Sequence, residues 1–307
     1  MVFGKSFRED GSIRYEGSFD KYGKFSGQGE CFYQNGNTRF NGNFFEGYLD
    51  DENCLENYTN GVRKYTGSFK KGVRCGNGAS YYENGAKMHM GNFLNGECED
   101  ENAYEYKETG ELHYKGSFVK GNWEGKGIRY YNNGDIMFKG RFVNGHRYKG
   151  REYRKNGVKR YYGYYKDGFY NDLGRYFDHN GNMRLDGAFY HGLMHCENGK
   201  QFFANTKLEY EGGFEFGMWN GFGKSYKENT DEVQFEGWWV NGQYCSKDKP
   251  TEEKLISLKR ELQLVADQDL IRNSETSDNS PKLNHCKISR DRLEGEEFVY
   301  KNSDIRI

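Results

Sequence analysis

The chain has 307 residues and a formal net charge of −1, with 42 glycines against only 2 prolines. Tyrosine (26) and phenylalanine (23) supply most of the apolar bulk, and the mean hydropathy is −1.07. This composition is too polar for a thick two-sided core and too aromatic for a disordered chain. It favours a thin sheet whose strands pair through the backbone and pack rings on one face.

Cellular location is constrained by what the sequence lacks. No stretch approaches the ~18 apolar residues of a membrane helix, and the N-terminus has no apolar signal segment. Seven dispersed cysteines are typical of reduced thiols. These features predict a cytoplasmic protein, and the near-zero net charge gives no indication of nucleic-acid binding.

An aromatic-x-Gly-x-aromatic core recurs from the N-terminus onward at intervals of 23 to 25 residues, as in Tyr65-Thr66-Gly67-Ser68-Phe69. A fixed period of this length indicates a repeat architecture. The ten central glycines are Gly17, Gly42, Gly67, Gly91, Gly116, Gly140, Gly163, Gly187, Gly212 and Gly237.

Each repeat predicts a β-hairpin. In a strand, positions i, i+2 and i+4 share a face, so Tyr65, Gly67 and Phe69 point the same way. We expect the glycine to leave room for a ring from the neighbouring repeat. Asn-Gly pairs such as Asn84-Gly85 predict hairpin turns in which both residues adopt positive φ. The prediction is an all-β fold: an elongated, single-layer, antiparallel β-hairpin solenoid over residues 1–247.

The pattern Y-x-G-x-F-x-x-G-x-x-x-G-x-G, complete at Tyr65–Gly78 and Tyr114–Gly127, resembles the MORN repeat. The resemblance covers roughly residues 3–245. The copies that begin at Phe40, His89, Phe138, Tyr161 and Leu185 lose all or part of the second glycine pair. The resemblance implies a scaffold role in cytoskeletal, ciliary or membrane-junction assemblies, and several relatives of this type are linked to phosphoinositides.

After the repeats the composition changes. Pro250 ends the last strand, Thr251 can cap a helix, and Leu255, Leu258, Leu262 and Val265 follow at helical spacing. We predict a linker and a short amphipathic helix over 248–271, then a disordered tail over 272–307. The helix is expected to cap the last repeat, with self-association and partner binding as alternatives.

Catalytic, cofactor and metal sites are not predicted. A phosphate loop needs its glycines before a helix, whereas Gly-x-Gly here recurs with the repeat. His191 and His195 lie in strand and turn, with no second ligand cluster in the sequence. The expectation is a non-enzymatic protein without a cofactor.

Charge concentrates in one part of the array. The segment from Lys139 to Lys166 holds ten basic residues and one acid, Glu152. Such a patch can attract anionic phospholipid headgroups or an acidic partner, although an ordinary solvated face is an alternative. The candidate patch is Arg147, Lys149, Arg151, Arg154, Lys155, Lys159 and Arg160.

The aromatic rows also have two interpretations. One row must pack between neighbouring repeats, and a single-layer sheet leaves another row to line an exposed groove that takes a helix or peptide. The candidate groove residues are Tyr65, Phe69, Tyr114, Phe118, Phe138, Phe142, Tyr161 and Tyr165.

Two functions remain open from sequence. The first is a scaffold that binds a protein partner, a helix or peptide, in the aromatic groove. The second is a peripheral membrane adaptor that binds anionic phospholipids, including phosphoinositides, through the basic patch. A remote alternative is a regulatory subunit of a lipid kinase or methyltransferase, since MORN arrays accompany such domains.

Overall fold

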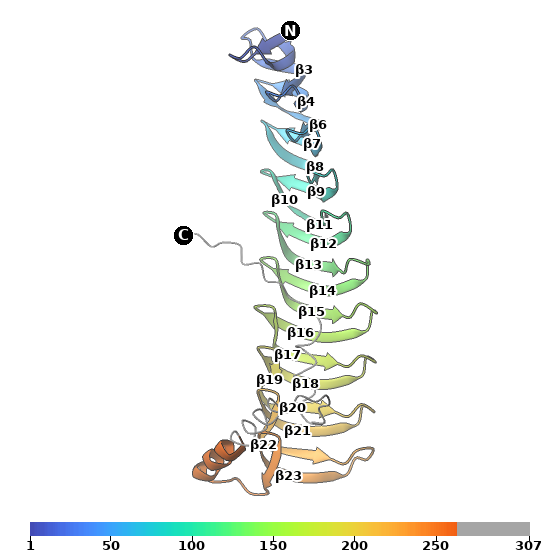
Figure 1. The fold of residues 1–307 in the computed structure, drawn as a ribbon, viewed down its shortest axis with the longest axis vertical. Helices are drawn as coiled ribbons and strands as arrows, with labels where there is room; N and C mark the ends of the chain where they lie inside the picture. Colours follow the sequence, from blue (N-terminus) through green and yellow to red (C-terminus); the bar gives the residue numbers. More distant parts are fainter. Residues whose placement is uncertain (263–307) are drawn as a thin grey trace, which may run out of the picture. The chain divides into compact units, whose positions relative to one another are not determined.

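The computed structural model describes residues 1–262. It consists of two compact units, unit 1 over Met1–Gly168 and unit 2 from Phe169 onward. In each unit, antiparallel strands follow one another in chain order, and each strand pairs with its neighbours in the chain. Figure 1 shows this succession. The predicted all-β hairpin repeat is therefore confirmed. The predicted tail over 272–307 lies outside the described residues, as does Val265.

Unit 1 contains sixteen strands, and two of them, β5 and β10, are short segments that precede β6 and β11. They are β1 Val2–Phe7, β2 Ile13–Phe19, β3 Phe25–Phe32, β4 Thr38–Phe45, β5 Tyr48–Leu49, β6 Asp51–Asn57, β7 Arg63–Lys70, β8 Val73–Tyr81, β9 Lys87–Leu94, β10 Glu97–Cys98, β11 Asp100–Tyr106, β12 Leu112–Val119, β13 Asn122–Tyr130, β14 Ile136–Val143, β15 His146–Tyr153 and β16 Lys159–Lys166.

Unit 2 continues the pattern and ends in a helix at residues 252–262. Its strands are β17 Phe169–Phe177, β18 Met183–Tyr190, β19 Leu193–Met194, β20 Cys196–Phe202, β21 Leu208–Glu215, β22 Met218–Tyr226, β23 Val233–Val240 and β24 Gln243–Ser246. The helix contacts the last hairpins through an ion pair of 2.8 Å between Lys259 and Glu215. Just before the helix, Lys249 lies over the Trp238 ring.

The two ends of each hairpin use different turns. At the tight end, both turn residues have positive φ, as at Lys71 (47°) and Gly72 (76°), which defines a type I′ turn. At the Asn-Gly end, Gly85 has φ of 87° and Asn84 does not have positive φ. The prediction that both Asn-Gly residues adopt positive φ is wrong. Here the Gly85 N–H donates to Tyr82 O at 3.0 Å and closes a type I turn. The glycine is the fourth residue of this turn.

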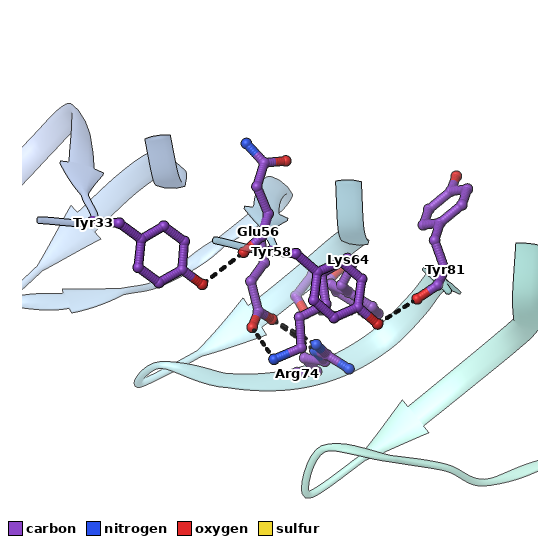
Figure 2. A network of polar contacts seen from close by, with 9 residues as sticks. Tyr33, Glu56, Tyr58, Lys64, Arg74 and Tyr81 are labelled. Atoms are coloured by element: carbon purple, nitrogen blue, oxygen red, sulfur yellow. Dashed lines mark hydrogen bonds and ion pairs between the residues drawn. The ribbon is translucent and has the colours of Figure 1, made fainter. Parts of the chain in front are cut away.

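The turn at the Asn-Gly end, which we call the wide turn, favours asparagine for a different reason. The Asn84 side-chain oxygen accepts the Ala86 N–H at 2.8 Å, and its amide donates to Glu108 O at 2.8 Å, one repeat further along. Tyrosines beside these turns make similar links, from Tyr33 Oη to Asn57 O (2.8 Å) and from Tyr58 Oη to Tyr81 O (2.7 Å), as Figure 2 shows. Neighbouring repeats are thus bonded at the turns as well as along the strands.

A column of paired glycines runs across the sheet. Gly67 lies opposite Gly78, which lies opposite Gly91. The ring of Tyr65 covers this pair, because a Cβ built on Gly78 would meet Tyr65 Oη at 2.1 Å. The tyrosine belongs to the same hairpin, so the expectation of a ring from the neighbouring repeat is wrong. We call the face that carries this column the inner face and the opposite one the outer face.

The rings of the inner face form the core. Tyr114 stacks on Trp123 of its own hairpin (4.5 Å between ring centroids) and meets Phe142 of the next hairpin edge-on at 5.1 Å. The covering tyrosine occurs in every second repeat, at Tyr15, Tyr65, Tyr114, Tyr161 and Tyr210, all fully buried. The structural period is therefore two hairpins, and each repeat packs on its neighbours only.

The glycine column gives the first prediction. Gly78→Ala forces a methyl group into the Tyr65 ring, so we expect the free energy of unfolding to fall by about 3 kcal/mol. Chemical denaturation measures it. Gly4→Ala is the matched control, because a Cβ at Gly4 meets Phe19 only at 3.6 Å. Equal losses in the two variants would contradict the role given to Tyr65.

Candidate functional site

The eight aromatic residues predicted to line a groove lie in the core. Tyr65, Tyr114, Phe138, Phe142 and Tyr161 are 0 % exposed. The other members, Phe69, Phe118 and Tyr165, are at most 4 % exposed. The prediction of an open groove lined by these rings is therefore wrong, because the inner face closes over its own rings.

Exposed apolar side chains lie instead beside the tight turns. In unit 1 we call Phe45, Tyr48, Val73, Leu94 and Val119 the turn row, and each is at least 45 % exposed. Tyr48 links two hairpins of this row. Its ring lies 3.6 Å from the position that a Cβ would take on Gly72, in the tight turn of the next hairpin. This edge is an apolar surface open to a partner.

The predicted basic patch is divided by the sheet. Arg147 turns to the inner face, where it pairs with Glu152 at 3.3 Å and lies over the Tyr165 ring. Arg160 pairs with the same carboxylate at 3.4 Å. The single carboxylate of Glu152 therefore pairs with both guanidinium groups and offsets one of their two charges.

Three further patch residues lie at the wide turn between β15 and β16. Arg154 donates to Lys159 O at 3.1 Å across the base of this turn, and Lys155 is exposed within it. Only Lys149 and Arg151 of the predicted patch lie on the outer face, because they flank the inward-facing Gly150.

The structure adds four cations to these two, from the preceding strands β12, β13 and β14. We call the outer-face set of β12–β15 the basic face. Lys126 lies directly opposite Arg141, which lies opposite Lys149. In the adjacent row, Lys139 lies opposite Arg151. The members of the basic face are Lys115, Lys126, Lys139, Arg141, Lys149 and Arg151.

The basic face is shallowly hollowed and bordered by tyrosines. An open hollow of about 780 Å³ is lined by Lys115, Lys126, Lys139 and Arg141, with Glu101 at its border. The ammonium of Lys149 donates to Tyr164 Oη at 2.8 Å, which raises the pKa of Lys149. Arg151 lies over the Tyr162 ring at 5.5 Å. The cations are therefore held in place and stay charged.

In unit 2, the outer-face positions that correspond to the basic face carry both acidic and basic residues. Its outer face carries alternating charges in register, with ion pairs Arg175–Asp186 (3.2 Å), Lys200–Glu211 (3.8 Å) and Lys224–Glu236 (3.1 Å). By contrast, no acid lies directly opposite any cation of the basic face in the β12–β16 register. Like charges opposite each other destabilise a sheet. The fold does not require the basic face, which marks it as a candidate anion-binding surface.

Sequence inspection missed Lys115 and Lys126 because it sought a contiguous basic stretch. The available signal was the alternation about the glycines: residues directly before or after an inner-face glycine point outward. Applying that rule to Gly116 and Gly127 places Lys115 and Lys126 on the outer face.

Buried carboxylates on the inner face have a structural role. The Glu56 carboxylate forms ion pairs with Arg74 at 2.7 Å and with Lys64 at 3.0 Å (Figure 2). The corresponding Glu105 is bonded by His113 Nδ1 (2.8 Å) and Trp123 Nε1 (2.8 Å), with His89 at 3.6 Å. Burial opposes ionisation of Glu105, but these hydrogen bonds outweigh it and lower its pKa to about 2.

Residues 1–262 contain no cluster of three or more His, Cys, Asp or Glu that could hold a metal. Their cysteines are free, and burial raises the pKa of the Cys54 and Cys98 thiols to about 12. No helix in this part of the chain is long and apolar enough to cross a membrane.

Comparison with known proteins found no matching family model and no similar curated protein.

Glu105 gives a pH prediction. Its lowered pKa contributes stability above about pH 4.5 that is lost as the pH falls toward about 2. Glu105→Gln should therefore cost about 2 kcal/mol at neutral pH, and the difference from wild type should shrink between these values. Gln201 occupies the equivalent place and accepts Trp219 Nε1 at 3.1 Å, so glutamine fits there. Urea unfolding from pH 2 to 7 measures the difference, and a pH-independent gap would refute the assignment.

Proposed function

We propose that this protein is a non-enzymatic adaptor of the MORN type, and that its basic face binds the headgroups of anionic phospholipids. The observation that carries the proposal is the ladder of like charges on β12–β15. Lys126, Arg141 and Lys149 stand side by side on three neighbouring strands. Such an arrangement costs stability in the isolated protein, and an anionic surface would remove that cost.

The geometry suits a surface better than a small enclosed ligand. The hollow over Lys115, Lys126 and Lys139 is open, so several headgroups can approach together. The cations come from four adjacent strands about 4.8 Å apart, and Ile128 lies between Lys115 and Lys139 in the same row. Each cation near an anionic membrane contributes about 1 kcal/mol.

Vesicle co-sedimentation tests this proposal. Lys139→Glu/Arg141→Glu should weaken binding to vesicles containing phosphatidylserine or phosphoinositide by more than roughly thirtyfold, because two cations are lost and two anions are added. Raising the salt concentration should weaken wild-type binding as well.

The matched control is Lys21→Glu/Lys87→Glu, which changes the net charge equally at exposed residues away from the basic face. It should bind like the wild type. Equal binding of wild type to neutral and anionic vesicles, or equal losses in both variants, would count against the basic face.

A second candidate function, the scaffold for a protein partner, is supported by the turn row rather than by the buried rings. Four successive tight turns expose an apolar side chain each, namely Phe45, Val73, Leu94 and Val119. Hairpins repeat about every 10 Å, two strand spacings, which equals the rise of about seven helical residues. We propose that the turn row takes an amphipathic helix with an apolar residue at every seventh position.

Phe45→Ser/Leu94→Ser tests the turn row. Both side chains are exposed, so the melting temperature should change little, whereas capture of a specific partner from native extract should fall at least tenfold. Circular dichroism and quantitative pull-down are the measurements. Undiminished capture by the variant would show that partners bind elsewhere.

A further inference from the structure

The outer face of unit 1 carries opposite charges at its two ends. On β2 and β3, Glu16 lies directly opposite Glu30. Lys5 pairs with Glu16 at 3.0 Å and neutralises part of this charge. We call Glu16 and Glu30 the acidic end. The basic face occupies β12–β15 at the other end.

Between the two charged ends, one cross-strand row of the outer face runs through half-buried residues without charge, each directly opposite the next in the register. Its members are Leu55, Thr66, Ala79, Met90 and Tyr104. The adjacent row is polar, with Asn77 directly opposite Asn92. The first row of the outer face therefore has an acidic end, an uncharged middle and a basic end.

These features are symmetric about the midpoint between β8 and β9. With β5 and β6 counted as one strand, and β10 and β11 likewise, Glu30 on β3 and Lys139 on β14 each lie about 22 Å from this midpoint. Glu16 and Arg151 each lie about 26 Å from it.

The hairpins of unit 1 stack in chain order, and the sheet twists gradually along the stack (Figure 1). A two-fold axis parallel to the strands at the midpoint, lying between two outer faces, would bring these faces together and place the acidic end of one copy over the basic face of another. An interface of this kind is isologous, so each charge pair occurs twice.

We infer that two copies of this chain associate antiparallel through the outer faces of their unit 1. Glu30 of one copy meets Lys139 and Arg141 of the other, and Glu16 meets Arg151. Ala79 and Met90 pack at the axis. The like-charge contacts within each copy, Glu16 opposite Glu30 and Lys139 opposite Arg151, then gain opposite charges across the interface.

The association has a consequence for the basic face. In the dimer this face is covered by the partner's acidic end, so self-association and binding to an anionic surface compete. The dimer does not depend on lipid binding, since it rests on the charges of the chain alone.

Sedimentation velocity on the full chain at low salt tests the inference. Wild type should be a dimer at tens of micromolar, and Lys139→Glu/Arg141→Glu should raise the dimer dissociation constant at least tenfold. Glu16→Lys/Glu30→Lys should do the same. An equimolar mixture of the two variants should dimerise again, because each interface then pairs one acid set with one basic set.

Lys247→Glu/Lys254→Glu, at exposed residues of unit 2, controls for net charge and should dimerise like the wild type. A monomeric wild type would overturn the inference, and so would a mixture that stays monomeric. A dimer that survives both charge reversals would place the interface elsewhere and also overturn it. Glu16→Lys/Glu30→Lys separates the two proposals, because it should lose the dimer yet keep vesicle binding.

Discussion

The close contact between a tyrosine ring and a pair of facing glycines is the constraint on which the rest of the structure depends. Tyr65 lies across Gly67 and Gly78, where any side chain would collide with its ring or with the opposite backbone. The same arrangement recurs at Tyr114 over Gly116 and Gly127. It buries a large aromatic side chain without a second layer, which is how a thin and polar chain obtains a core.

Because the core lies entirely on the inner face, the outer face is released from packing. Its charges are free to alternate, as in the ion-pair ladder of unit 2, or to segregate, as in unit 1. Alternation stabilises the sheet, whereas segregation weakens it and leaves surfaces that other molecules can satisfy. The proposals for lipid binding and for self-association both follow from this second arrangement.

The errors of sequence-based prediction share one physical origin. Tyr65 and Tyr161 were candidates for an open groove, and Arg147 for an exposed patch, because proximity in sequence and residue type were the only guides. A strand sends neighbouring residues to opposite faces, and a β-bulge at Tyr148 shifts this alternation by one residue. Arg147 therefore reaches Glu152 on the inner face, whereas Arg151, four residues later, faces outward.

The amino-acid sequence alone determined the repeat, the strand positions and the central glycines, because each depends on local chain geometry and a 23 to 25 residue period. It also contained every charge of the basic face. Only the tertiary structure decided that Lys115 and Lys126 join Lys139 and Arg141, and that Glu152 pairs with both Arg147 and Arg160. Hairpin register sets these groupings, since it brings residues from different repeats onto one face.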